Sequence, residues 1–211
     1  MTPLKYTLAA LALLVAPVPA LAESHSATTT AAPTDAAPAV IEMTLGNPDS
    51  AVTVTEYASF TCGHCANFHS NQFKKLKADY IDTGKINFVY RDVYFDRVGL
   101  WAAMVARCDA DRIFGVSDLI YTKQSEWMDS RDPVQLAENL KKIGKIAGLS
   151  GDAVDACMKD ADNAKALVDW FQTNVDADDI SATPTLLING EKHENMPYKD
   201  LKAILDEKLG S

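Results

Sequence analysis

The sequence predicts a mixed-sheet α/β domain that is interrupted by a long helical segment. Two runs rich in β-branched and apolar residues, at 52–57 and 184–188, lie near the two ends of the chain's patterned part. Between them, from residue 97 to residue 176, apolar residues recur at three- and four-residue steps. Strands separated by helices favour an α/β sheet, and the long helical stretch is then an insertion into that sheet.

The first residues have the pattern of a secretory signal. Lys5 precedes the apolar run Leu8–Val15, and a small-residue cleavage site follows at 20–22, so we expect residues 1–22 to be removed on export. The next segment, 23–39, is rich in Ala, Thr and Pro without apolar periodicity, and we expect a disordered leader. Export predicts an oxidising compartment, in which thiols tend to pair or exchange.

The charge of the chain disfavours some classes of partner. The formal net charge of −9 becomes −10 when Lys5 leaves with the signal. A protein this acidic is a poor candidate for binding nucleic acid or anionic lipid. About 170 residues remain after the leader, enough for one domain with its own core.

The first part of the sheet domain is expected at residues 40–96. A short strand at 40–43 and a turn at 46–49 precede the strand at 52–57. A helix then starts at the cysteines and ends at Gly84, and a further strand follows at 85–91. The apolar face of this helix consists of Ala66, His69, Phe73, Leu76 and Tyr80.

The helical insertion is expected at residues 97–177. Asp132 is a predicted helix N-cap, with Pro133 in the first turn. The predicted apolar faces of the helices consist of Trp101, Met104, Val105 and Cys108; of Leu136, Leu140, Ile143 and Ala147; and of Leu167, Val168, Phe171 and Val175.

The sheet domain resumes at residues 178–211. A strand at 184–188 leads through the hairpin turn Asn189-Gly190 into a second strand at 191–193. The chain ends with an amphipathic helix at 198–209.

Cys62 and Cys65 are the predicted reactive centre. Two cysteines separated by two residues can close a small disulfide, and the helical pattern places Cys62 at a helix N-terminus. Unpaired backbone N–H groups and the helix dipole favour an anion there, so Cys62 should ionise more easily than Cys65. Cys65, one turn into the helix, suits the role of the resolving thiol.

Other kinds of site fit this motif less well. A c-type haem site needs His directly after the second Cys, where this chain has Ala66. A tetrahedral zinc site needs four ligands, and the chain has no second CxxC and no His pair at finger spacing. Binding of zinc or copper with help from His64 or His69, and a purely structural disulfide, remain as alternatives.

Glu56 is a candidate proton carrier for the cysteines. Strand alternation places it on the same face as Val52 and Val54, directly before the CxxC motif. If that face is buried, the carboxylate resists ionisation and can relay a proton to or from Cys65. The alternative is an edge-strand Glu whose carboxylate reaches solvent.

Cys108 and Cys157 are predicted to form a structural disulfide between two helices of the insertion. The local pairing of Cys62 with Cys65 leaves them as partners. Joining them closes a loop of about fifty residues, which contributes roughly 4 kcal/mol in the chain-entropy model. A second redox centre is the alternative interpretation.

The chain resembles the DsbA-like thiol:disulfide oxidoreductases over Gly46–Leu209. The resemblance rests on the run from Glu56 to Cys65, on Ala182-Thr183-Pro184-Thr185 and on the helical insertion between them. It implies a thioredoxin fold with an inserted helical domain.

The resemblance also implies roles for individual residues. Cys62 would be the nucleophile and Cys65 the resolving thiol, while Gly63 and His64 would help to set how oxidising the site is. His64 would stabilise the Cys62 thiolate. Pro184 would be a cis proline facing the disulfide, and the backbone of Thr183 would bind an extended substrate chain.

Glu56 matches the buried acid of the family, with one departure. The basic residue that often accompanies that acid is not evident in 86–91, where Val89 takes its place. Arg91 is the one candidate substitute.

The expected function is that of a monomeric periplasmic dithiol oxidase without a bound cofactor. Exported proteins with free cysteines would be its substrates, and a DsbB-like membrane quinone reductase would reoxidise it. A disulfide isomerase or reductase of the same fold is the nearest alternative. A periplasmic copper or zinc carrier is the alternative from another class.

Overall fold

A five-stranded mixed sheet lies at the centre of residues 39–210, the part of the chain that this computed structural model describes. The predicted signal, 1–22, and almost all of the predicted leader, 23–39, lie outside the described residues. The strand order is β1-β3-β2-β4-β5, with β2 and β3 parallel and the other pairs antiparallel. The strands are β1 (Met43–Gly46), β2 (Thr53–Ala58), β3 (Asn87–Asp92), β4 (Thr185–Ile188) and β5 (Glu191–Glu194).

The helix that carries the cysteines connects the parallel strands β2 and β3. It consists of α1 (Gly63–Phe68), the π-helical stretch His69–Phe73, α2 (Lys74–Leu76) and the π-helical stretch Lys77–Ile81. These follow one another without an intervening loop, as the apolar spacing predicts. Gly84 then takes a positive φ of 68° in the turn that leads to β3, a conformation that favours glycine.

Six α-helices and one short 3₁₀-helix (Ala110–Arg112) follow β3, and α9 (Tyr198–Leu209) is the last helix of the described residues. The predicted cap at Asp132 is confirmed, because its side chain accepts a hydrogen bond from the Val134 N–H at 3.0 Å. Within residues 39–210 no helix is both long enough and apolar enough to cross a membrane. The six helices are α3 (Arg97–Ala106), α4 (Ile113–Thr122), α5 (Gln124–Trp127), α6 (Pro133–Ile146), α7 (Gly151–Lys159) and α8 (Ala161–Ala177).

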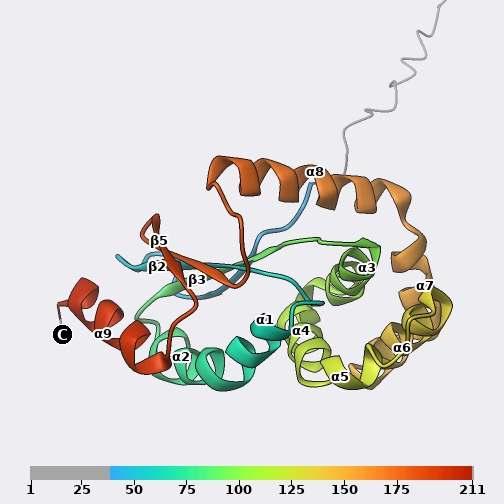
Figure 1. The fold of residues 1–211 in the computed structure, drawn as a ribbon, viewed down its shortest axis with the longest axis horizontal. Helices are drawn as coiled ribbons and strands as arrows, with labels where there is room; N and C mark the ends of the chain where they lie inside the picture. Colours follow the sequence, from blue (N-terminus) through green and yellow to red (C-terminus); the bar gives the residue numbers. More distant parts are fainter. Residues whose placement is uncertain (1–38, 211) are drawn as a thin grey trace, which may run out of the picture. The chain divides into compact units, whose positions relative to one another are not determined.

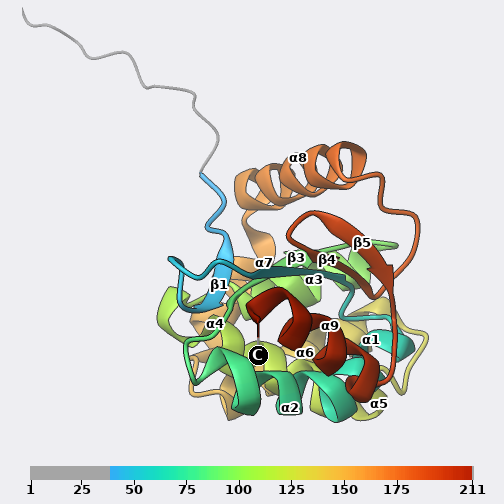
Figure 2. The ribbon, with the colours of Figure 1, turned by 90° about the vertical axis from the view of Figure 1, so that its left-hand side faces the viewer.

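Helices cover both faces of the sheet (Figures 1 and 2). One face carries Val54 and Phe88 and packs into the main core with the cysteine helix, α3, α4 and α9. The other face carries Tyr57 and Leu187 and packs against Phe171 of α8 and its neighbours. The last helix of the insertion therefore forms a second layer over the sheet.

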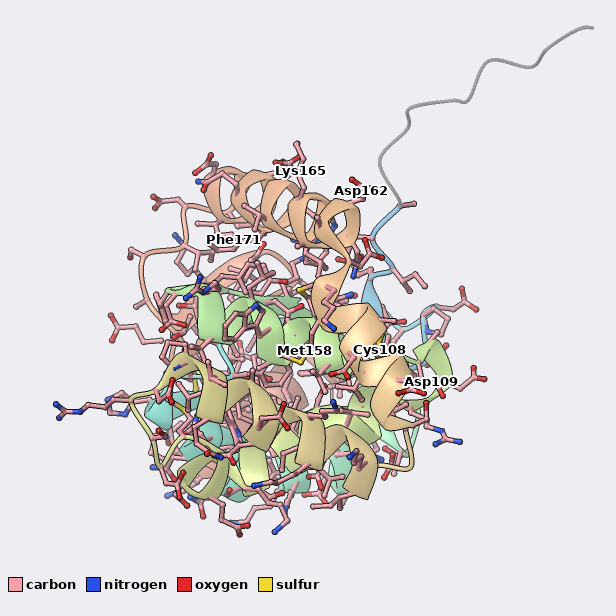
Figure 3. The ribbon with its side chains drawn as sticks, turned by 90° about the vertical axis from the view of Figure 1, so that its right-hand side faces the viewer. Cys108, Asp109, Met158, Asp162, Lys165 and Phe171 are labelled. Atoms are coloured by element: carbon pink, nitrogen blue, oxygen red, sulfur yellow. A yellow bond between two sulfur atoms is a disulfide. The ribbon has the colours of Figure 1, made fainter. Side chains whose placement is uncertain are left out.

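The packing of α8 corrects one detail of the predicted apolar stripes. Phe171 lies on the side of α8 that faces the sheet, whereas Lys165 and Asp162 lie on the outer side (Figure 3). The Phe171 ring is 5.1 Å from the ring of Tyr94. Val168, which was predicted to be in the core, is 40% exposed. Val168 therefore lies beside, and not within, the side of α8 that carries Phe171 and packs on the sheet.

Two predicted boundaries differ from the structure, one at the start of a strand and one at the end of a helix. The first strand begins at Met43, and residues 40–42 precede it. Cys108 does not lie on a helix, because α3 ends at Ala106 with Arg107 as its C-cap.

A disulfide joins Cys108 to Cys157, with 5.7 Å between the two Cα atoms. It ties the segment after α3 to α7, and Figure 3 labels Cys108 beside that helix.

A buried ion pair anchors the insertion to the sheet. The Arg107 Nε, at the end of α3, donates to Asp92 Oδ2 of β3 at 2.9 Å. The two side chains are only 6% and 1% exposed. Arg107 also donates to the carbonyl oxygen of Ile41, and its guanidinium lies over the Trp170 ring of α8. One side chain thus connects α3, β3 and α8.

Candidate functional site

The two predicted reactive cysteines lie at the start of α1, directly after β2. Cys62 is the N-cap residue of this helix, and its Sγ accepts a hydrogen bond from the Cys65 backbone N–H at 3.3 Å. Cys62 is partly exposed, whereas Cys65 is fully buried. An incoming thiolate can therefore reach Cys62 and not Cys65.

The environment separates the two thiols in acidity. Hydrogen bonding to the Cys65 thiol lowers the pKa of Cys62 to about 5, with further help from Thr183 and from the backbone N–H groups of Cys65 and His64, against the opposing effect of burial. The same thiol–thiol hydrogen bond, together with burial, raises the pKa of Cys65. At neutral pH the reduced site therefore holds one thiolate at Cys62 and one thiol at Cys65.

The residues between the cysteines are both exposed. His64 acts on Cys62 through its backbone N–H, which is one of the groups that lower the Cys62 pKa. An added Cβ at Gly63 would meet no atom within 4 Å, so close packing does not require glycine there. A role for the His64 imidazole and for Gly63 in binding or tuning stays a prediction.

The loop before β4 faces Cys62 from the other side. The peptide bond between Thr183 and Pro184 is cis. The carbonyl oxygen of Thr183 lies 3.6 Å from Cys62 Sγ. Antiparallel pairing of β4 with β2 places this loop beside the CxxC motif, although about 120 residues separate them in sequence.

Glu56 is buried on the cysteine side of the sheet. Glu56 is 3% exposed and lies on the same face of β2 as Val54, as strand alternation predicts. Burial, and then the negative charge of Cys62, raise the pKa of the Glu56 carboxyl to about 8. The edge-strand alternative, with a carboxylate in solvent, is wrong for this structure.

Arg91 does not replace the basic partner that the family often has for this acid. In the parallel register Glu56 is paired with Tyr90, so Val89 and Arg91 point to the opposite face of β3. There Arg91 Nη1 donates to the Tyr57 hydroxyl at 2.8 Å and to Asp178 Oδ2 at 3.0 Å. Arg91 thus stabilises the contact between the sheet and the end of α8.

The cysteine loop is held in place by Gln124, a residue that no sequence pattern marks as functional. Gln124, at the start of α5, donates from its Nε2 to the carbonyl oxygens of Phe60 at 2.8 Å and of Cys62 at 3.0 Å. These acceptors lie 64 and 62 residues away along the chain. No local spacing signals such a contact.

His69 is also bound within the protein. Its Nε2 lies 2.9 Å from Asp118 Oδ1, and its ring stacks between Phe73 and Tyr121. Within residues 39–210 no group of three or more His, Cys, Asp or Glu side chains is placed to bind a metal ion.

Comparison with known proteins agrees with this geometry. A family model described as thioredoxin matches residues 39–207. A putative protein-disulfide oxidoreductase of Rickettsia bellii is 33% identical over 170 residues, which are 80% of this chain and 64% of the relative. Disulfide bond formation protein D of Bacillus subtilis is 26% identical over 178 residues, 78% of this chain and 76% of the relative. The crystal structure of Wolbachia pipientis alpha-DsbA1 is similar with a TM-score of 0.72 and 29% identity, over 82% of this chain and 93% of that one.

These matches extend over most of this chain but over less than two thirds of the Rickettsia bellii relative. They confirm the predicted thioredoxin fold with a helical insertion and the predicted likeness to DsbA-type proteins. The chain belongs to the thioredoxin family, and within that family its relatives are DsbA-type disulfide oxidoreductases.

Proposed function

We propose that the protein is a periplasmic dithiol oxidase, which donates the Cys62–Cys65 disulfide to exported proteins. The observation that supports this most strongly is the separation of the two thiols in acidity. A Cys62 pKa near 5 stabilises the reduced site, because the thiolate there is held by hydrogen bonds. A disulfide whose reduced form is stabilised has a higher reduction potential, so it gives its disulfide away readily.

The exchange proceeds through a mixed disulfide. A substrate thiolate attacks Cys62 Sγ, the Cys62–Cys65 bond breaks, and Cys65 leaves as a thiolate that takes up a proton. A second thiolate of the substrate then attacks the substrate sulfur that is bonded to Cys62. The substrate disulfide forms, and Cys62 leaves as a thiolate. The substrate has lost two electrons to the site, which is left as one thiolate and one thiol.

We assign Glu56 as the group that exchanges a proton with Cys65. A carboxyl whose pKa lies near 8 is largely protonated at neutral pH, so it can donate a proton to the departing Cys65 thiolate. In the reverse direction its carboxylate accepts the Cys65 proton. The Glu56 charge is one of the causes that raise the Cys65 pKa, which supports the proximity of the two side chains.

The loop at Thr183 and Pro184 is the proposed substrate-binding edge. The Thr183 carbonyl beside Cys62 Sγ supports this, since an extended substrate chain could pair with this backbone while its cysteine reaches the sulfur. Gly63, exposed and without near neighbours, leaves room for that chain. We further propose that the protein acts as a monomer and that a DsbB-like membrane protein reoxidises it.

Reduction potential distinguishes an oxidase from its alternatives. Equilibration with glutathione buffers, followed by alkylation and intact mass, should give a potential well above that of thioredoxin. A potential as low as that of thioredoxin would favour a reductase or isomerase. A Cys65→Ser variant should accumulate the mixed disulfide with a reduced substrate peptide, whereas Cys62→Ser should form none. Stoichiometric binding of zinc or copper without disulfide transfer would favour a metal carrier.

A further inference from the structure

A small cavity beside Glu56 connects the buried acid to a histidine. The cavity has a volume of about 20 Å³, and Glu56 and His69 both line it. This is enough for one water molecule, which needs roughly 10–15 Å³ of such space. The wall also carries the Ser117 side chain and the Tyr90 and Tyr121 rings, whose hydroxyls are 2.6 Å apart. The residues that line the cavity come from β2, β3, α4 and the cysteine helix, and most of the surface that they present to it is apolar. Glu56 and His69 are its two ionisable side chains other than the tyrosines.

His69 leads from this cavity to the surface. The His69 side chain is 8% exposed, and its Nε2 lies 2.9 Å from the Asp118 carboxylate. The Asp118 side chain is 48% exposed and so is in contact with solvent. The order from inside to outside is Cys65, Glu56, the cavity, His69 and Asp118.

The imidazole is in a suitable protonation state for passing a proton. Burial lowers the pKa of His69, against the opposing effect of Asp118. The ring is therefore neutral at neutral pH, with one nitrogen able to accept a proton and the other able to donate one. Stacking between Phe73 and Tyr121 fixes the plane of the ring.

From this arrangement we infer that His69 and Asp118 form the proton outlet of the active site, connecting Glu56 to solvent through the cavity. The inference rests on the proposed function and extends it from the acid to the path behind it. His69 and Asp118 act as positioning and relay residues, since neither touches the reacting sulfurs. This outlet provides Glu56 with a route that does not require a basic partner on β3.

The proton and the electrons balance in each step. When Cys65 attacks Cys62 in a mixed disulfide, its proton passes to the Glu56 carboxylate, the new Cys62–Cys65 bond forms, and the substrate thiolate leaves. Glu56 then returns to its carboxylate form by passing a proton through the cavity to one nitrogen of His69. The other nitrogen releases a proton to Asp118 and solvent, where the departed thiolate can take one up.

Charged and titratable groups near Glu56 and His69 also affect how the rate of attack by Cys65 depends on pH. Lys74 near His69 is exposed, and its charge favours the neutral imidazole. The charge of Cys62, the N-cap of α1, acts on Glu56, and the charges of Asp118 from α4 and Lys74 from α2 act on His69. The Glu56 charge in turn raises the pKa values of its neighbours Cys65 from α1, Tyr90 from β3 and Tyr121 from α4.

The test isolates the step in which Cys65 loses its proton. Reduced protein is mixed with saturating oxidised glutathione, quenched with acid, and analysed by intact mass, which separates the Cys62–glutathione mixed disulfide from the resolved disulfide. At saturation the conversion between these species is unimolecular and reports the attack by Cys65. The rate is measured from pH 5 to pH 9 in wild type, His69→Gln, His69→Phe and Asp118→Asn.

We expect resolution to be slower by roughly tenfold in His69→Gln and His69→Phe, and by several-fold in Asp118→Asn, within the range that proton-transfer groups contribute. The Cys62 titration midpoint and the equilibrium constant with glutathione should stay at wild-type values, because a relay changes the rate of proton transfer and not its end points. Glu56→Gln combined with His69→Gln should be no slower than Glu56→Gln alone. His193→Gln, on β5, is the matched control and should resolve at the wild-type rate.

Two results would overturn the outlet. One is a resolution rate within about twofold of wild type in His69→Phe, which keeps the stacked ring, or in the folded Asp118→Asn variant. The other is a multiplicative effect of Glu56→Gln and His69→Gln, which would mean that the two residues act independently. A wild-type protein that forms no mixed disulfide would instead contradict the proposed function itself.

Discussion

Replacing Glu56 by Gln should stabilise the reduced protein increasingly as pH rises. The Glu56 carboxyl has a pKa of about 8 in the folded protein, against an ordinary value of 4.5. The folded state therefore keeps a proton that the unfolded state loses between these two values. The stability that this proton provides is fully present below pH 4.5 and is lost as pH rises through about 8.

The size of the effect follows from the two pKa values. One pH unit of difference corresponds to about 1.4 kcal/mol. At pH 7 the wild type should have lost about 3 kcal/mol relative to pH 4.5, and above pH 8 the loss should approach about 5 kcal/mol. The neutral Gln side chain carries no such dependence, so the difference in unfolding free energy between the two proteins should grow by these amounts.

Urea denaturation of both reduced proteins at pH 4.5, 7 and 9 measures this difference. Any constant change from fitting an amide into the site appears at every pH and does not affect the slope. Glu126→Gln removes a carboxyl whose side chain is 67% exposed and serves as the control for loss of one charge. Parallel stability curves for wild type and Glu56→Gln would refute the reasoning, because they would mean that Glu56 ionises alike in the folded and unfolded states.

Three further predictions concern the thiols, the cysteine loop and the insertion. Alkylation of the reduced protein with iodoacetamide should show a midpoint near pH 5 for Cys62, with Cys65 modified far more slowly; equal labelling of both thiols would contradict the assignment. Gln124→Leu should lower the unfolding free energy by about 1–3 kcal/mol, because two carbonyl oxygens lose their donor, and an unchanged urea midpoint would count against this. Arg107→Met should cost about 3–5 kcal/mol by leaving Asp92 buried without its partner, and a second change of Asp92→Asn should recover much of that loss in the same assay.

The fold could be predicted largely from local patterns. The apolar spacing after Cys62 predicts the helix that runs to Ile81, and β-branched runs predict β2 and β4 to within a residue or so. Strand alternation alone places Glu56 on the same face as Val54. These features depend on residues within a few positions of one another along the chain, so the sequence pattern is enough to predict them.

The predictions failed where the answer depends on packing between distant segments. Arg91 was the candidate partner for Glu56, yet its strand face directs it to Tyr57 and Asp178. Val168 fits an apolar helical stripe but lies outside the narrower face by which α8 meets the sheet. In both cases the secondary structure was predicted correctly. Which of its side chains become buried, or which neighbours they bind, depends on the element that packs against it.

The sequence by itself determined where the candidate reactive cysteines lie, that Cys62 begins a helix, and which strand face carries the acid. These follow from spacing along one chain segment, because helix and strand geometry fix the direction of nearby side chains. Only the tertiary structure decided that Gln124 holds the cysteine loop and that His69 meets Asp118 beside the Glu56 cavity. Those contacts join segments that are about 50 or more residues apart, and their geometry exists only once the sheet and the insertion have packed together.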